Sequence, residues 1–521
     1  MSVSVGLRSI GLTIALLALS SCGSGTGGGG TGGGGTGGGV TNRAPTFSSP
    51  SSVTYNENTV GPAYIATASD PDGDPLTFAI APGGADNARF AMRQDGEFYF
   101  TGSAGNLAGN YESAADVGGN NVYELSISVT DGKSAPVIQT VQISVANGPE
   151  FEAALVASGL LTTANPPELT AAAATNDGSG RIYTAELGGV VRIFSPGQPG
   201  VRPTFMDLRG TSASQITISG LAPAPDFAAS GRFFVLLRDN TSVEVRRYDT
   251  VAGNRDAIDL ATGDVIFRTT ASCCEQSGWI GFGPDNLLYI NTRSGTDQEE
   301  GEAQLLTSLR GKILRIDVGS DAFPGDPLRD YAIPNANPYV AGGGLPEIFV
   351  RGFRNPRSGQ FDRANGNLYM LDPSAGGSSF NELNIVRPSD GGRDYGFPAC
   401  QANGSGCSGT EPPVFRCIQA AENCGTLTAG LLYRGPFTEL NNVYLFADSY
   451  GLYPQRSSLS AIENRLLQVG APVPRDIRAA FRSLPGFPLE LSPAVVSMVQ
   501  SEANTIYFVT RSGDIYEVRQ L

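Results

Sequence analysis

The 521 residues of this chain include no histidine. The reactive side chains that remain are mainly carboxylates and cysteines. Histidine is the side chain that proteins use most often to move protons near neutral pH. Its absence excludes a Ser-His-Asp triad, a zinc site with histidine ligands and a histidine-ligated haem. Any reaction of this protein must therefore rely on carboxylates, amides, arginines, metals or a bound cofactor.

Acidic residues gather in short polar segments between residues 42 and 148. These acids are Glu57, Asp70, Asp72, Glu112 and Asp131. The Asp70–Asp74 run is not an EF-hand loop, because its twelfth position is Ala81 rather than glutamate.

The cysteines indicate an exported protein with disulfides. Six of the seven follow residue 270: Cys273, Cys274, Cys400, Cys407, Cys417 and Cys424. An even number of cysteines in an exported chain predicts disulfides, although sequence alone leaves the connectivity open. Their matching spacing favours 400–407 and 417–424 bonds. The adjacent pair either forms a vicinal ring or pairs with the later cysteines.

Residues 1–22 read as an export signal that ends in a lipoprotein cleavage box at Cys22. Residues 23–41 are almost entirely glycine, threonine and serine, which is typical of a flexible linker. We expect a protein of the bacterial cell envelope, anchored through lipid on Cys22, periplasmic or surface-exposed. Gly23 resembles the residue that follows the cysteine in lipoproteins sorted to the outer membrane.

Membrane contact through the lipid alone is expected, since no other apolar run is long enough to cross a bilayer. The net charge of −15 argues against a nucleic-acid partner.

Two all-β domains must position the reactive side chains. Residues 42–148 alternate with a period of two between turns, which predicts a β-sandwich. Residues 149–521 repeat a polar turn followed by an apolar-aromatic strand, which predicts a six-bladed β-propeller. The six copies are 180–183, 231–234, 286–289, 366–369, 442–445 and 504–507.

The 42–148 segment resembles bacterial cadherin-like domains in the order of its acidic motifs and the strand rhythm between them. In that family the carboxylates meet at one pole and bind calcium. The resemblance implies such a site from Glu57, Asp70, Asp72, Glu112 and Asp131. An alternative interpretation is an Ig-like spacer whose acids only cap turns.

Seven motifs follow one another along residues 155–518. They are Ser219–Phe227, Gly278–Asp285, Gly311–Asp317, Tyr331–Pro334, Pro346–Ile348, Gly352–Pro356 and Asp394–Pro398. In this order they resemble the soluble quinoprotein sugar dehydrogenases, the glucose/sorbosone dehydrogenase family. The resemblance implies pyrroloquinoline quinone (PQQ) above the channel, calcium beneath it, and hydride transfer from a sugar to the quinone.

The resemblance also implies site residues. Glu275 stands where the family has its histidine base, and a carboxylate can serve as a general base. Gln215, Arg354 and Asn355 match cofactor-contacting positions, although a buried arginine also commonly ties loops together. The alternative for Glu275 is a loop that has lost its catalytic residue.

The family's calcium loop corresponds to the stretch from Asp372 to Glu382, where Gly376 and Gly377 could present carbonyl oxygens. The family's later cations are missing, since no lysine follows Lys312 and residues 495–498 carry no charge. A polyanionic cofactor would bind weakly without them.

Three functions follow. The first is a cell-envelope, PQQ- and calcium-dependent dehydrogenase of a sugar or other alcohol. The second is an inactive propeller that binds a cell-surface glycan or protein. A calcium-dependent hydrolase such as a lactonase is the third, but its Glu/Asn/Asp set cannot be assembled from this sequence.

Overall fold

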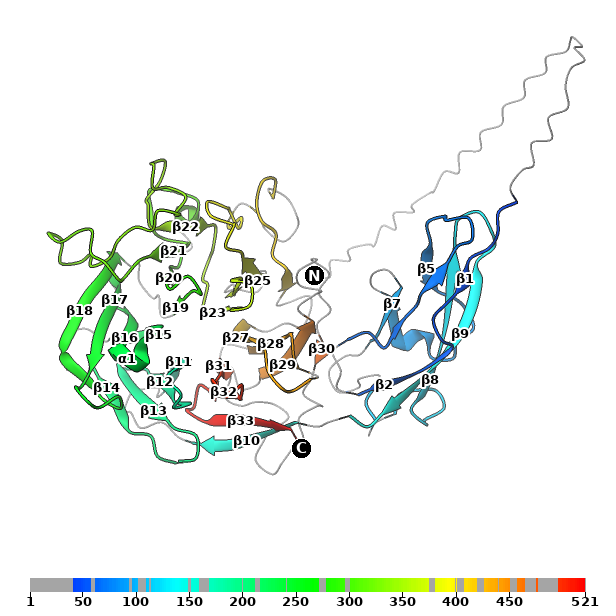
Figure 1. Ribbon diagram of the computed structural model, residues 1–521, viewed down its shortest axis with the longest axis horizontal. Coiled ribbons are helices and arrows are strands. Elements are labelled where there is room, and N and C mark those ends of the chain that lie inside the picture. The colour runs from blue at the N-terminus through cyan, green and yellow to red at the C-terminus, as the bar shows by residue number, and fades with distance from the viewer. Residues whose placement is uncertain are drawn as a thin grey trace, which may run out of the picture.

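The computed structural model describes most of the chain after residue 40 (Figure 1). The described ranges are 41–57, 61–92, 96–101, 109–111, 114–148, 151–158, 168–198, 200–210, 216–239, 241–270, 278–295, 300–373, 380–398, 400, 407–418, 426–438, 440–449, 457–463, 475–476 and 495–520. Cys22 and the predicted signal lie outside them. Within these ranges no helix has the length and apolar character needed to cross a membrane.

The N-terminal domain is a β-sandwich. One sheet has the order β2-β9-β8-β5, a second has the order β3-β7-β6, and β1 pairs with β4. The bounds are β1 Thr46–Phe47, β2 Ser52–Asn56, β3 Tyr64–Ile65, β4 Ala68–Ser69, β5 Thr77–Ile80, β6 Phe90–Met92, β7 Glu97–Phe100, β8 Val122–Thr130 and β9 Val137–Ala146, with a 3₁₀ turn η1 at Asn87–Arg89. The period-two alternation places Leu125, Ile127, Val141 and Ile143 in the core with no exposed surface.

The rest of the chain is a β-propeller. Among the described residues, 151–520 form six four-stranded sheets, each with antiparallel neighbours. The first three are β11 Leu169–Ala174, β12 Ile182–Glu186, β13 Val190–Phe194 and β14 Thr204–Asp207; β15 Thr217–Pro223, β16 Arg232–Arg238, β17 Ser242–Thr250 and β18 Ile258–Thr270; β19 Ile280–Phe282, β20 Leu288–Asn291, β21 Lys312–Ile316 and β22 Ile348–Arg351. The others are β23 Ser358–Phe361, β24 Leu368–Asp372, β25 Phe380–Val386 and β26 Phe415–Ile418; β27 Thr426–Tyr433, β28 Val443–Ser449, β29 Ser457–Glu463 and β30 Arg475–Asp476; β31 Val495–Gln500, β32 Ile506–Thr510, β33 Ile515–Gln520 and β10 Phe151–Ala157. Short helical turns occur at α1 Phe227–Ser230 and η2 Glu300–Ala303.

The sequence repeat corresponds to the second strand of each sheet, and its first residue has a left-handed backbone. These six residues have positive φ: Gly180 (66°), Gly231 (70°), Asn286 (61°), Gly366 (79°), Asn442 (62°) and Asn504 (61°). Glycine and asparagine are the residues that adopt this conformation most readily. The turn chemistry therefore explains why the repeat begins with one or the other.

The ring is closed by pairing the first strand of the propeller with the last. β10 pairs with β33, so that Phe151 lies opposite Gln520. Figure 1 shows the sheets following one another around the ring, with red β33 beside cyan β10. The last sheet is thus assembled from both ends of the domain.

A central channel runs between the first strands of the sheets. β11, β15, β19, β23, β27 and β31 each contribute residues to a cavity of about 540 Å³. One strand from every sheet lines this cavity, which places it on the axis of the propeller.

Lys312 is buried at the start of β21 and holds the preceding loop. Its Nζ donates to the carbonyl oxygens of Glu302 (2.8 Å), Ala303 (3.0 Å) and Arg310 (2.5 Å). Burial lowers the pKa of this ammonium to about 7. The chain has only one other lysine, Lys133, which is exposed and pairs with Asp74.

We expect Lys312→Met to lower the free energy of unfolding of the propeller by about 3 kcal/mol, because three buried carbonyls lose their donor. Lys133→Met, the matched control, is expected to change it by less than about 1 kcal/mol. Calorimetric unfolding of the full chain measures both. Equal effects of the two substitutions would contradict this structural role.

Candidate functional site

The inner strands begin at an end of the channel that carries many charged side chains. Leu169 N–H donates to Arg511 O (2.9 Å), and Arg357 N–H donates to Leu371 O (3.0 Å). These contacts bring the starts of β11 and β23 to the turns that follow β32 and β24. We call this the charged end, defined by Glu168, Arg293, Arg354, Arg357, Asp372 and Arg511.

Asp372 connects the predicted site residues of the propeller that the structure describes. Its Oδ2 accepts the Arg354 N–H (2.8 Å) and its Oδ1 accepts the Asn355 N–H (2.6 Å). Asp372 and Asn355 are buried. Burial raises the pKa of Asp372 to about 6, against the opposing effect of these two hydrogen bonds. The Arg-Asn pair and the predicted metal loop are therefore joined through one carboxylate.

Glu382 lies directly across β24–β25 from Asp372. Burial, followed by the charge of Asp372, raises the pKa of Glu382 to about 8. Asn384, two residues along β25, is fully buried and donates weakly to Glu382 (3.5 Å). Its Oδ1 has no hydrogen-bond partner within the described residues.

Two facing carboxylates and an unpartnered buried amide oxygen make a donor set that fits a hard cation. Gly376 and Gly377 lie outside the described residues, so their carbonyl oxygens stay a prediction. The side chains present fit calcium, which would need to displace a proton from Glu382 at neutral pH.

Three arginines at the charged end were missed by the sequence analysis. Burial lowers the pKa of Arg357 to about 10, and the charges of Arg511 and Arg293 lower it further. Arg511 pairs with Glu168 (3.4 Å), and Arg354 pairs with Glu300 (3.3 Å). Arg357 follows a motif already singled out, and Arg511 follows the last repeat copy. Arg357 and Arg511 come close together only because the sheets close into a ring.

The acidic residues of the N-terminal domain divide between two poles. Asp70, Asp74 and Asp131 offer oxygens within 4.8 Å of one another. Asp72 is instead bound by the Arg43 guanidinium (2.8 Å). Glu112 lies outside the described residues.

Glu57 corrects the expectation of a single pole. Its carboxylate accepts the N–H groups of Tyr111 (2.7 Å) and Gly148 (3.2 Å). β2 runs parallel to β9, so Glu57 follows Asn56 at the level of Ala146, whereas Asp131 precedes the start of β9. Ten strand residues span about 30 Å, so Glu57 cannot share a cation with Asp131.

Comparison with known proteins covers both domains. Residues 42–144 match the model of a bacterial Ig domain, and residues 170–413 match that of glucose/sorbosone dehydrogenase. We call residues 170–413 the glucose/sorbosone dehydrogenase region, because this is the family that they are similar to. The charged end falls largely within this region.

Curated relatives of this chain include the Hedgehog-interacting proteins of Mus musculus and Homo sapiens. Each is 27% identical over 307 residues, which cover 53% of this chain and 40% of the relative. The chain thus spans about two fifths of the length of these relatives. HIPL2 protein of Arabidopsis thaliana is 34% identical over 132 residues, 23% of this chain and 18% of the relative.

Solved structures share the propeller fold. The PQQ-bound aldose sugar dehydrogenase of Streptomyces coelicolor has a TM-score of 0.53 at 19% identity, covering 72% of this chain and 98% of that one. The apo soluble aldose sugar dehydrogenase of Escherichia coli has a TM-score of 0.51 at 16% identity, covering 71% and 100%. At these identities the likeness establishes the fold alone.

Several predicted residues of the propeller lie outside the described residues. They are Gln215, Cys273, Cys274, Glu275 and Cys424. Thr217, two positions after Gln215, begins the inner strand β15. The roles assigned to Gln215 and Glu275 stay predictions.

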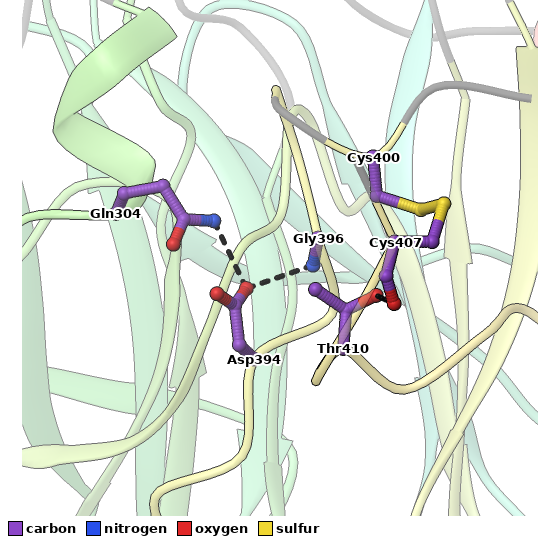
Figure 2. Close-up of a disulfide and its surroundings, with 6 residues drawn as sticks. All are labelled: Gln304, Asp394, Gly396, Cys400, Cys407 and Thr410. Atoms are coloured by element: carbon purple, nitrogen blue, oxygen red, sulfur yellow. Dashed lines mark hydrogen bonds between the residues drawn. A yellow bond between two sulfur atoms is a disulfide. The ribbon is translucent and has the colours of Figure 1, made fainter. Parts of the chain in front are cut away.

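The cysteine-rich loop of the propeller begins beside Arg354. The structure has the Cys400–Cys407 disulfide that the spacing favours, and Figure 2 shows it beside Gly396 and Thr410. Asp394 Oδ1 accepts the Gly396 N–H and the Gln304 amide (2.8 and 2.9 Å). The Arg354 guanidinium lies 5.7 Å from the Phe397 ring centre. In the described residues Cys417 is a β26 residue opposite Asn381, and its bond to Cys424 stays a prediction.

Proposed function

We propose that the propeller is a PQQ- and calcium-dependent dehydrogenase that oxidises an aldose or a similar alcohol. The observation that carries this proposal is the joining of Arg354 and Asn355 to Asp372, with Glu382 facing Asp372 across the sheet. Two residues matched to cofactor contact are thereby bonded to Asp372, one of the two carboxylates matched to calcium. The family match of residues 170–413 supports the same activity.

The charged end supplies the groups that this reaction needs. Asp372, Glu382 and Asn384 would hold calcium, and Arg354 would face the cofactor's acidic groups. PQQ, when bound, supplies a two-electron acceptor. Glu275 would accept the proton of the substrate hydroxyl as general base.

The full-length protein, loaded with calcium and PQQ, tests the proposal. We expect reduction of an electron-accepting dye with at least one aldose of a panel. Absence of turnover on every sugar, together with absence of a cofactor absorbance band on the purified protein, would overturn it.

A binding protein of the cell surface is the second candidate. It is favoured by the 27% identity to relatives that are named for interacting with another protein. In this case the propeller would present its loops to a glycan or protein and would not turn over sugars. Retention on a glycan array by a protein that neither binds PQQ nor reduces dye would support this alternative.

We further propose that lipid on Cys22 anchors the protein in the bacterial cell envelope, at the outer membrane. Cys22→Ser is then expected to move the protein from the membrane fraction to the soluble fraction. Retention in the membrane would overturn the anchor.

A second calcium site is proposed in the Ig domain at Asp70, Asp74 and Asp131. Asp70 Oδ2 and Asp74 Oδ2 are buried atoms that have no hydrogen-bond partner among the residues that the structure describes. Lys133 Nζ contacts Asp74 (2.5 Å) and would move aside for the cation.

Calcium at a hundred times its dissociation constant is expected to stabilise the Ig domain by about 2.7 kcal/mol. Asp74→Asn is expected to abolish this gain in stability. Asp72→Asn is expected to preserve it, because the Asp72 carboxylate pairs with Arg43. Calorimetry of the full chain with calcium or a chelator measures both. Equal loss in the two variants would argue against this ligand set.

A further inference from the structure

One of the two lysines of the chain lies among the three acids of the proposed calcium site in the Ig domain. Lys133 Nζ is 2.5 Å from a carboxylate oxygen of Asp74. The charges of Asp131 and Asp70 also attract this ammonium. The chain therefore supplies a positive charge of its own to the site.

The turn between β8 and β9 fixes the lysine beside the site. Asp131 Oδ1 accepts the backbone N–H groups of Lys133 (2.8 Å) and Ser134 (2.7 Å). Gly132 has a φ of 74°, a left-handed conformation that glycine adopts without steric cost. One acid of the site thus anchors the residue whose ammonium contacts another, and the ammonium cannot diffuse away.

Two oxygen atoms of the site are not used by the ammonium. Asp70 Oδ2 and Asp74 Oδ2 are buried, and within the described part of the chain neither has a hydrogen-bond partner. An ammonium has one charge and three N–H donors, whereas a calcium ion binds about six to eight oxygens. Calcium would therefore satisfy oxygens that the lysine leaves without a partner.

We propose that Lys133 is an internal competitor that sets the calcium affinity of the Ig domain. The inference rests on the proposed calcium site and adds the regulation of that site. Calcium binding must break the ion pair between Lys133 and Asp74. The displaced ammonium stays tethered nearby at a high effective concentration and repels the bound ion. Its side chain is 58% exposed and can move into solvent without a change of fold.

Removal of the lysine charge tests the competition. Lys133→Met is expected to raise the calcium affinity of the Ig domain about fivefold, the factor that corresponds to a well-formed surface ion pair. Lys133→Arg keeps the charge and is expected to stay within about twofold of wild type. The full chain is titrated with calcium and followed by hydrogen exchange of peptides that contain residues 131–134. This measurement is local, so calcium in the propeller does not contribute to it.

Arg43 offers a matched control at the same pole. Its guanidinium pairs with Asp72, and the side-chain exposures of 61% and 16% are close to the 58% and 16% of Lys133 and Asp74. Arg43→Met removes the same charge, but Asp72 is not one of the three acids of the site. We expect this variant to shift the affinity by less than about twofold. Melting curves without calcium show whether each variant is folded.

The outcomes separate this inference from the proposed calcium site. Tighter calcium binding by Lys133→Met than by Arg43→Met supports the competitor, even where the wild type binds no calcium. Equal affinities of wild type and Lys133→Met would overturn the competitor and leave the calcium site in place. Equal gains in Lys133→Met and Arg43→Met would assign the effect to net charge and would also overturn it. Absence of binding in both wild type and Lys133→Met would overturn the site and the competitor together.

Discussion

Glu275→Gln is expected to lower kcat for sugar oxidation by two to four orders of magnitude, the usual contribution of a positioned general base. Glutamine keeps the size of the side chain but cannot accept the proton of the substrate hydroxyl. Affinity for PQQ is expected to remain within about twofold of wild type, since Glu275 carries no proposed contact with the cofactor's acidic groups.

Steady-state dye reduction gives kcat, and equilibrium titration of PQQ gives the affinity. Gln276→Ala changes the neighbouring side chain and is expected to retain most of the activity. Full turnover by Glu275→Gln would assign the base to another group. A variant that loses PQQ binding would point to a structural role.

Calcium affinity of the propeller is expected to rise about a hundredfold between pH 6 and pH 8. Burial and the charge of Asp372 raise the pKa of Glu382 to about 8, so the metal-free site holds a proton below that pH. Calcium must displace this proton, and displacement of one proton changes the apparent affinity about tenfold per pH unit. The dependence is expected to level off above pH 8.

The titration is made in an Asp74→Asn background, which removes the proposed site in the Ig domain. Glu382→Gln is expected to bind calcium more weakly and with a flatter pH profile. A folded-state pKa raised from 4.5 also means that stability of the metal-free propeller falls as pH rises from about 4.5 to 8. A pH-independent affinity in the parent chain would contradict the assignment of Glu382 as a ligand.

The propeller could be predicted because its signal is local. Each repeat copy needs a left-handed residue before an apolar strand, and Gly180 and Asn504 meet that need with different side chains. Arg354, Asn355 and Asp372 were assigned to the site from two motifs that resemble a known family, but their contact with one another is a finding of the structure. Its geometry, through backbone N–H groups, could not be read from the residue types.

Features that depend on contacts between strands far apart in the sequence could not be predicted from the sequence. Glu57 occurs in an acidic motif like those around Asp70 and Asp131, yet the parallel pairing of β2 with β9 carries it to the far pole. Arg357 and Arg511 belong to different sheets and meet only around the channel. No lysine follows Lys312, but arginine charge is concentrated at the charged end of the channel.

The pairing of β10 with β33 has a consequence for biosynthesis. Phe151 lies in the first strand of the propeller and its partner Gln520 in the last, so nearly the whole domain separates the two residues in sequence. Strand pairing between the two ends must await release of the whole domain from the ribosome, and this non-local contact favours slow, late folding. If the chain is exported as an extended polypeptide, late closure keeps it from locking into a ring before it has crossed the membrane.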